Sequence, residues 1–174
     1  QKRGKTELRV ALSQNGKTVS EFKLPLVVFG TRLGADDLAN VKQVAMLYDL
    51  WGRTRTGGAD AKTLTLNGTP AGKLAGSGGY PTWISRVRAK LDPKAGGGLK
   101  QRNRLTIGNP TSKFWKIRNV LLEVTLKDDS VVHLRGDPGT RSSPPDHPWA
   151  EAEKVKTGEP FVYDLPAAQD SETP

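Results

Sequence analysis

Residues 115–126, with the sequence WKIRNVLLEVTL, form the longest strand candidate in the chain. Apolar and polar side chains alternate over the second half of this stretch, as expected for a strand with one buried face. The phase of the alternation changes between Ile117 and Val120, which predicts a β-bulge between them. The turn Asp128-Asp129-Ser130 follows, and residues 131–134 are then expected to form the returning strand.

Shorter strand candidates precede this pair along the chain. The turn signals Asn15-Gly16 and Asn67-Gly68 predict hairpins. Residues 41–50 fit a helical period as well as a strand period, and the neighbouring strands favour the strand. In residues 83–91 we expect an apolar face that includes Trp83, and we expect Trp115 to lie in the core as well. The other strand candidates are residues 7–12, 19–22, 26–29, 64–66, 73–74 and 105–107.

Short, regularly spaced strands separated by Gly- and Pro-rich turns predict an all-β fold. We expect an antiparallel β-sandwich of the jelly-roll type with extended N- and C-terminal tails. Residues 1–6 would form a basic arm, residues 7–136 the sandwich domain, and residues 137–174 a Pro-rich acidic tail. Within the tail, only Phe161-Val162-Tyr163 with Leu165 has the pattern of a late strand.

Three pieces of sequence between residues 64 and 126 resemble one known family. They are residues 64–72, which contain the Asn67-Gly68 turn, then residues 83–91, and then residues 103–107 followed by residues 115–123. In their order and side-chain types these pieces are similar to the galactose-binding-domain-like jelly rolls that accompany many glycoside hydrolases. The resemblance covers about a third of the chain, and the loop at residues 93–102 is longer than in that family. It implies a β-sandwich whose loops commonly bind sugars, in a fold that also serves architectural modules.

The residue types that catalysis requires are scarce in this chain. It has no cysteine and two histidines, His133 and His147. No Gly-x-Ser-x-Gly elbow and no histidine pair with metal spacing occurs, so we expect no enzymatic activity. The acidic pairs Asp36-Asp37 and Asp128-Asp129 could contribute to a structural calcium site, although turn chemistry explains them equally well. We therefore expect no cofactor.

The predicted ligand site is the Gly-rich segment that begins at Trp51. A tryptophan ring can stack on the C–H face of a sugar while arginines donate hydrogen bonds to its hydroxyl groups. We therefore expect a glycan to bind at Trp51, Arg53 and Arg55, with Tyr80 as a second platform. The alternative is that Trp51 packs under its own loop.

Charge is distributed unevenly along the chain, whose formal net charge is +9. From Asp146 onward seven acidic residues stand against two lysines, so the preceding part is strongly basic. Arg86, Arg88 and Lys90 alternate along one strand and could attract a polyanion. We do not expect nucleic acid as a partner, because no aromatic residues alternate with these basic residues in the sequence.

The acidic tail offers a second type of contact. Trp149, Phe161 and Tyr163 could dock, together with the acidic residues around them, on the surface that carries Arg86, Arg88 and Lys90. Docking on another copy would give an oligomer or a filament. Docking on the tail's own domain is the alternative.

The beginning of the chain and its hydropathy indicate where the protein acts. The first residue is Gln1 rather than Met, which predicts that a leader has been removed and that the protein is secreted or lies at the cell surface. No stretch reaches the roughly 18 consecutive apolar residues of a membrane span. We therefore expect an extracellular carbohydrate-binding or ancillary module, or alternatively a self-assembling subunit of a filament or surface layer.

Overall fold

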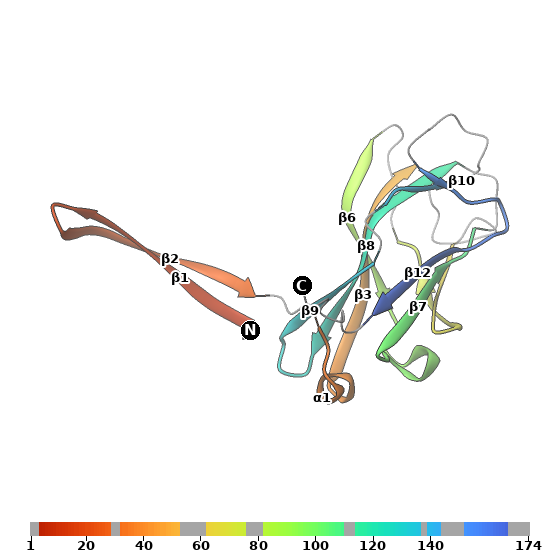
Figure 1. Cartoon of the computed structure of the whole chain (residues 1–174), viewed down its shortest axis with the longest axis horizontal. Helices are drawn as coiled ribbons and strands as arrows, with labels where there is room; N and C mark the ends of the chain where they lie inside the picture. The colour runs from red at the N-terminus through yellow and green to blue at the C-terminus, as the bar shows by residue number, and fades with distance from the viewer. Residues whose placement is uncertain are drawn as a thin grey trace, which may run out of the picture.

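In the computed structural model, two β-sheets pack face to face and form an all-β sandwich (Figure 1). The structure describes residues 4–28, 32–52, 62–75, 82–109, 114–136, 139–143 and 152–166. No helix in these ranges is long and apolar enough to cross a membrane. The two packed sheets confirm the predicted all-β sandwich.

The larger sheet has the strand order β11-β10-β8-β3-β6, with β9 also paired to β8. Its strands are β3 (Val41–Gly52), β6 (Trp83–Leu91), β8 (Trp115–Leu126), β9 (Val131–Arg135), β10 (Arg141–Ser143) and β11 (Glu153–Lys154). The smaller sheet has the order β12-β7-β4-β5. It consists of β4 (Thr63–Leu66), β5 (Thr69–Lys73), β7 (Arg102–Ile107) and β12 (Phe161–Pro166).

Alternation along β3 decides the packing of the larger sheet. Val44, Met46, Tyr48 and Leu50 are each at most 1% exposed and belong to the core cluster. β3 pairs antiparallel with β8 on one side and with β6 on the other. The ambiguous segment 41–50 is therefore a strand, as predicted.

Trp115 joins the two sheets at one end of the core. Its ring is fully buried and meets the ring of Phe161 edge-on, with 4.5 Å between the ring centroids. Its indole Nε1–H donates to Oδ1 of the buried Asn109 at 3.0 Å. The core position expected for Trp115 is confirmed.

The C-terminal segment differs from the predicted separate tail. β12 pairs antiparallel with β7, and Phe161, Tyr163 and Leu165 are each at most 1% exposed. β12 therefore belongs to the smaller sheet of its own chain and does not lie on the surface of Arg86, Arg88 and Lys90. The predicted boundary at residue 137 was wrong, because three apolar side chains in strand alternation bury enough area to hold a strand in the core.

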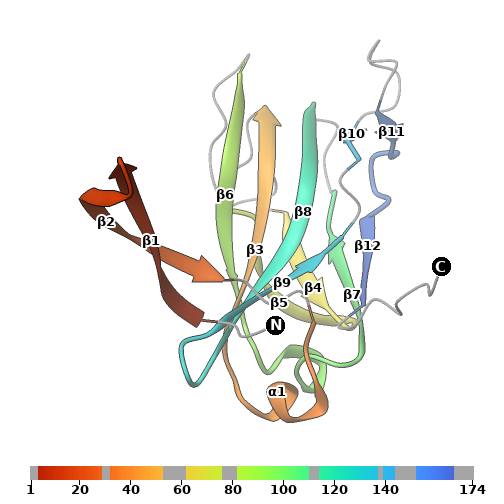
Figure 2. The ribbon, with the colours of Figure 1, turned by 60° about the vertical axis from the view of Figure 1, so that its left-hand side comes forward.

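The N-terminal hairpin also differs from the prediction, which counted it among the strands of the sandwich. β1 (Gly4–Gln14) and β2 (Lys17–Val28) form a two-stranded sheet of their own. Figures 1 and 2 show it standing away from both sheets of the sandwich. From here on we call residues 4–28 the arm, in place of the basic arm predicted for residues 1–6. The Asn15-Gly16 turn, with both residues at positive φ, was predicted correctly.

In the described ranges, two short helices complete the fold. α1 (Ala35–Ala39) leads from the arm side into β3, and η1 (Ala95–Gly97) lies in the connection between β6 and β7. α1 lies at the same end of the sandwich as the β8–β9 turn, where the Lys127 N–H donates to the Asn40 carbonyl at 2.9 Å. The arm therefore joins the sandwich at this end.

The position of Phe161 gives a test of the C-terminal strand. We expect Phe161→Ala to lower the free energy of unfolding by about 3–5 kcal/mol, because it leaves a cavity beside Trp115. Asp164→Ala on the same strand is the control, because Asp164 is exposed and its loss should stay within about 0.5 kcal/mol. Chemical denaturation measures both variants, and equal losses would show that β12 lies outside the core.

Candidate functional site

Asp49 in β3 occupies the point where both neighbouring strands bulge. The register of β3 shifts against β6 between Tyr48 and Leu50, and against β8 between Leu47 and Asp49. At these shifts Arg86 and Asn119 take the left-handed conformation, with φ of 56° and 54°. The predicted bulge in β8 is confirmed, and the one in β6 was not predicted.

The carboxylate of Asp49 stabilises both bulges. One oxygen accepts the backbone N–H of Arg86 at 3.0 Å, and the other accepts the side-chain amide of Asn119 at 2.8 Å. Nε of Arg118 donates to the second oxygen at 3.3 Å. A left-handed residue other than glycine is strained, so these hydrogen bonds offset a local cost on both strands.

The same contacts determine the acidity of Asp49. Burial alone would raise the pKa of this carboxyl group, since Asp49 is only 7% exposed. The hydrogen bonds from Arg86, Asn119 and Arg118, together with the charge of Arg118, outweigh burial and hold the pKa below its usual 3.8. Asp49 is therefore ionised at neutral pH.

Beyond the bulges, aromatic rings and cations form a cluster on the outer face of the larger sheet. Trp51 pairs in register with Trp83 on one side and with Lys116 on the other. Nζ of Lys116 lies 4.7 Å from the ring centroid of Trp51, and the guanidinium carbon of Arg118 lies 4.2 Å from that of Trp83. Phe114 meets Trp51 edge-on at 5.0 Å. Burial lowers the pKa of the Lys116 ammonium group.

On the other side of the bulges, the register aligns side chains in rows across the outer face. One row runs from Arg88 in β6 through Leu47 and Leu121 to Arg135 in β9. The next row runs from Lys90 through Ala45 and Glu123 to His133. Glu123 accepts from Arg88 at 2.9 Å and lies 3.4 Å from Nε2 of His133. The outer face therefore carries basic groups on both of its flanks.

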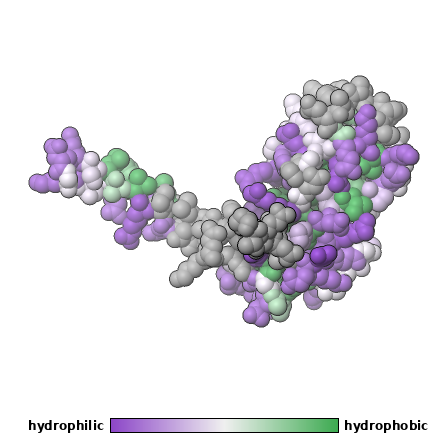
Figure 3. Space-filling model, in the orientation of Figure 1, coloured by the Kyte–Doolittle hydropathy of each residue, from purple (hydrophilic) through white to green (hydrophobic). Residues whose placement is uncertain are grey.

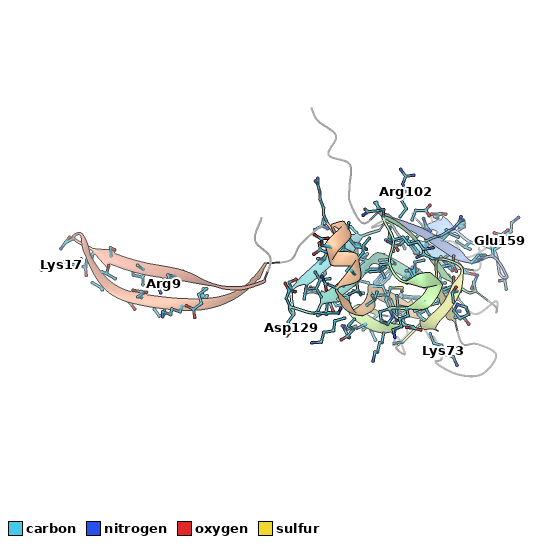
Figure 4. The ribbon with its side chains drawn as sticks, turned by 90° about the horizontal axis from the view of Figure 1, so that it is seen from below. Arg9, Lys17, Lys73, Arg102, Asp129 and Glu159 are labelled. Carbon is cyan, nitrogen blue, oxygen red and sulfur yellow. The ribbon has the colours of Figure 1, made fainter. Side chains whose placement is uncertain are left out.

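The arm presents a second surface with different chemistry. Alternation in the register that pairs Val10 with Phe22 puts Leu12, Phe22 and Leu24 on one face of the hairpin, where they are 52%, 51% and 49% exposed. Green surface marks apolar residues along the arm in Figure 3. The opposite face carries the pair Glu7 and Lys23, whose charged atoms lie 4.0 Å apart. Figure 4 shows Lys17 at the tip of the arm.

Of the residues predicted to bind a glycan, only Trp51 lies in the described part of the chain. Trp51 is 6% exposed, so the expected exposed platform was wrong, because Lys116 and Phe114 cover this ring. Arg53, Arg55 and Tyr80 lie outside the described residues, as do Trp149 and His147. Trp83, expected in the core, lies half-buried on the outer face, because the bulge at Arg86 changes the phase of β6.

In the acidic pairs, Asp37 and Asp128 form turn contacts and Asp129 forms an ion pair with β3. Asp37 accepts the Gly34 N–H at 2.8 Å at the start of α1, Asp128 accepts the Ser130 N–H at 3.0 Å, and Asp129 pairs with Lys42 at 2.7 Å. Within the described ranges, no three His, Cys, Asp or Glu side chains gather as metal ligands. The contacts of Asp37 and Asp128 are the turn contacts that the sequence offered as the alternative to a calcium site.

Sequence reasoning did not identify Arg118, Lys116, Arg135 or the exposed apolar face of the arm as functional candidates. The phase change in residues 115–126 was the available signal for Arg118, since the alternation before a bulge is out of phase with the alternation after it. The exposure of Leu12, Phe22 and Leu24 had no local signal. Alternating apolar residues look the same whether or not a second layer covers them.

Comparison with known proteins gives no relative for this chain. No family model, no curated protein and no solved structure matches it. The resemblance to galactose-binding-domain-like modules therefore stays a prediction.

The Asp49 contacts predict how stability depends on pH. The carboxylate contributes a stability that is complete above pH 3.8 and is lost as the pH falls through the lower pKa of the folded state. We expect Asp49→Asn to lower the free energy of unfolding at pH 7 by about 1–3 kcal/mol and to make it fall less between pH 5 and pH 2. Chemical denaturation over this pH range measures both effects. Parallel profiles of the free energy of unfolding against pH for Asp49→Asn and for the unaltered chain would contradict the role given to Asp49.

Proposed function

We propose that this protein is a non-enzymatic, self-associating structural module that acts outside the cell and joins other copies through its arm. The single observation that carries the proposal is the apolar face of the arm, where three large side chains are about half exposed. In the sandwich, the residues of the core cluster are at most 8% exposed.

A two-stranded hairpin with one apolar face is marginally stable in water unless something packs against it. The arm has 11- and 12-residue strands, so much of its apolar area faces solvent in the isolated chain. An exposed and contiguous apolar surface of this type marks a contact surface.

A second copy of the arm is the partner that fits best. Two identical faces can pack about a twofold axis, which places each Phe22 and Leu24 against the same residues of the other copy. The apolar face brings no like charges together, since Glu7 and Lys23 lie on the opposite face. The charged pair of the arm therefore does not oppose association through the apolar face.

The size of the arm predicts a weak contact. At about 3.3 Å per residue and 4.8 Å between strands, its face measures roughly 40 by 10 Å. Two such faces bury on the order of 800 Å², less than the roughly 1,200 Å² at the lower end of stable interfaces. We therefore expect reversible association at micromolar or higher concentration.

Glycan binding was the first expectation from the sequence and receives less support. Its central ring, Trp51, is covered by Lys116 and Phe114. Assembly through the C-terminal segment also receives less support, because Phe161 and Tyr163 are buried in their own sandwich.

Association is tested by replacing the apolar face. We expect the double variant Phe22→Ser with Leu24→Ser to stay monomeric at concentrations where the unaltered chain shows a larger average mass. The reason is that serine removes the buried area that drives association. Sedimentation velocity over a concentration series measures the masses.

The control replaces the neighbouring residues on the opposite face of the same strand. Glu21→Ser with Lys23→Ser changes as many side chains and leaves the net charge the same. This variant should associate like the unaltered chain. Monomeric mass for the unaltered chain throughout the series, or equal loss in both variants, would contradict the proposal.

A further inference from the structure

We propose that the outer face of the larger sheet binds single-stranded nucleic acid. This inference goes beyond self-association and does not depend on the arm. It rests on unpaired basic groups, on their spacing, and on an aromatic ring stacked with a guanidinium group. The opposite outer face of the sandwich provides a comparison.

The first observation is an excess of cations on this face. Arg88, Lys90, Arg118 and Arg135 lie on it, and the exposed Arg86 stands at the bulge beside them. The acidic groups in register with these residues are Asp49 and Glu123. Both acidic groups already accept from Arg118 and Arg88. Among the described residues Arg86, Lys90 and Arg135 form no ion pair and are exposed, so their charges are available to a polyanion.

The second observation is the spacing of these groups. Arg88 and Lys90 are successive outward residues of β6, and therefore stand about 6.7 Å apart along the strand. Arg135 flanks the same rows three strands away, which is roughly 14 Å. Cations on both flanks of a flat sheet can hold a phosphate backbone that runs across it.

The third observation is the ring of Trp83 at one end of the face. Trp83 is half-buried, and the guanidinium group of Arg118 lies over its ring at 4.2 Å. The Arg118 side chain is 39% exposed, so the stack has an accessible side. A nucleobase can continue such a stack, because every base has a π-face that packs on an aromatic ring or on a guanidinium plane.

This stack favours nucleic acid over a sulfated polysaccharide. A tryptophan ring can also stack on a sugar, but here the guanidinium group of Arg118 lies over the ring, and a guanidinium plane stacks on a nucleobase. The sequence showed no aromatic residues alternating with Arg86, Arg88 and Lys90. The bulge at Arg86 provides that arrangement, because it turns Trp83 to the face that carries Arg118.

The outer face of the smaller sheet provides an internal comparison. Arg102 and Arg104 lie exposed on β7, and Figure 4 shows Arg102 pointing away from the body of the protein. Asp164 stands opposite Arg104 in the register and is also exposed. In the described part of the chain this face offers no tryptophan, so it serves as the control surface.

The test measures binding of a fluorescein-labelled oligo(dT) of about 20 nucleotides, a length that spans one or more single-strand sites. We expect binding that weakens as the salt concentration rises. In the double variant Lys90→Gln with Arg135→Gln, the slope of the logarithm of the binding constant against the logarithm of the salt concentration should be smaller by about 1.4, which is about 0.7 for each lost phosphate contact. The matched control, Arg102→Gln with Arg104→Gln, removes the same charge from the opposite face and should bind like the unaltered chain.

A second variant separates nucleic acid from other polyanions. We expect Trp83→Leu to weaken oligo(dT) binding about tenfold, in line with the loss of one stacked base. The same variant should leave binding of a heparin fragment unchanged. Circular dichroism and thermal melting verify that each variant is folded.

Three results would overturn the proposal. They are no binding of oligo(dT) at low salt, equal weakening by the two charge variants, and tighter binding of heparin than of oligo(dT) with no effect of Trp83→Leu. The last would assign the face to a sulfated polysaccharide. The Phe22→Ser and Leu24→Ser variant should keep nucleic acid binding, so a failure of arm association and a failure of this proposal are distinguishable.

Discussion

The carboxylate of Asp49 links three adjacent strands of the larger sheet, β6, β3 and β8, at the point where their register changes. β6 and β8 each bulge beside it, and its two oxygens accept from Arg86 on one strand and from Arg118 and Asn119 on the other. A bulge changes which face the next side chain takes. The position of Trp83 on the outer face, next to Arg118 instead of in the core, therefore depends on this one buried acid.

The arm and the sandwich depend on different interactions. The sandwich is held by a core to which both sheets contribute, closed at one end by the contact of Trp115 with Phe161. The arm is held by its own backbone ladder and its Asn15-Gly16 turn. An element of this kind adds little to the stability of its own chain and gains most when its apolar face is covered. The self-association that we propose would supply this cover.

Local pattern predicted the strands well and their assembly less well. The neighbouring strands favoured a strand for residues 41–50, which fit a helical period as well, and the change of phase in residues 115–126 placed the bulge there. The arm was assigned to the sandwich, since the alternation in β1 and β2 does not reveal what covers them. β12 was assigned to a tail because Pro-rich and acidic composition outweighed three apolar residues. The cluster of Trp83 and Arg118 joins residues of different strands through a bulge at Arg86, where no glycine marks a left-handed residue.

We infer that contact with another copy orders the arm, and amide hydrogen exchange is the most direct test of this inference. We expect the exchange of the backbone amides in β1 and β2 to slow as the protein concentration rises through the micromolar range. The amides of β3 and β8, which lie in the core of the sandwich, should exchange at the same rate throughout. Arm amides whose exchange rate does not change with protein concentration would contradict this inference, because another copy would then have no effect on the order of the hairpin.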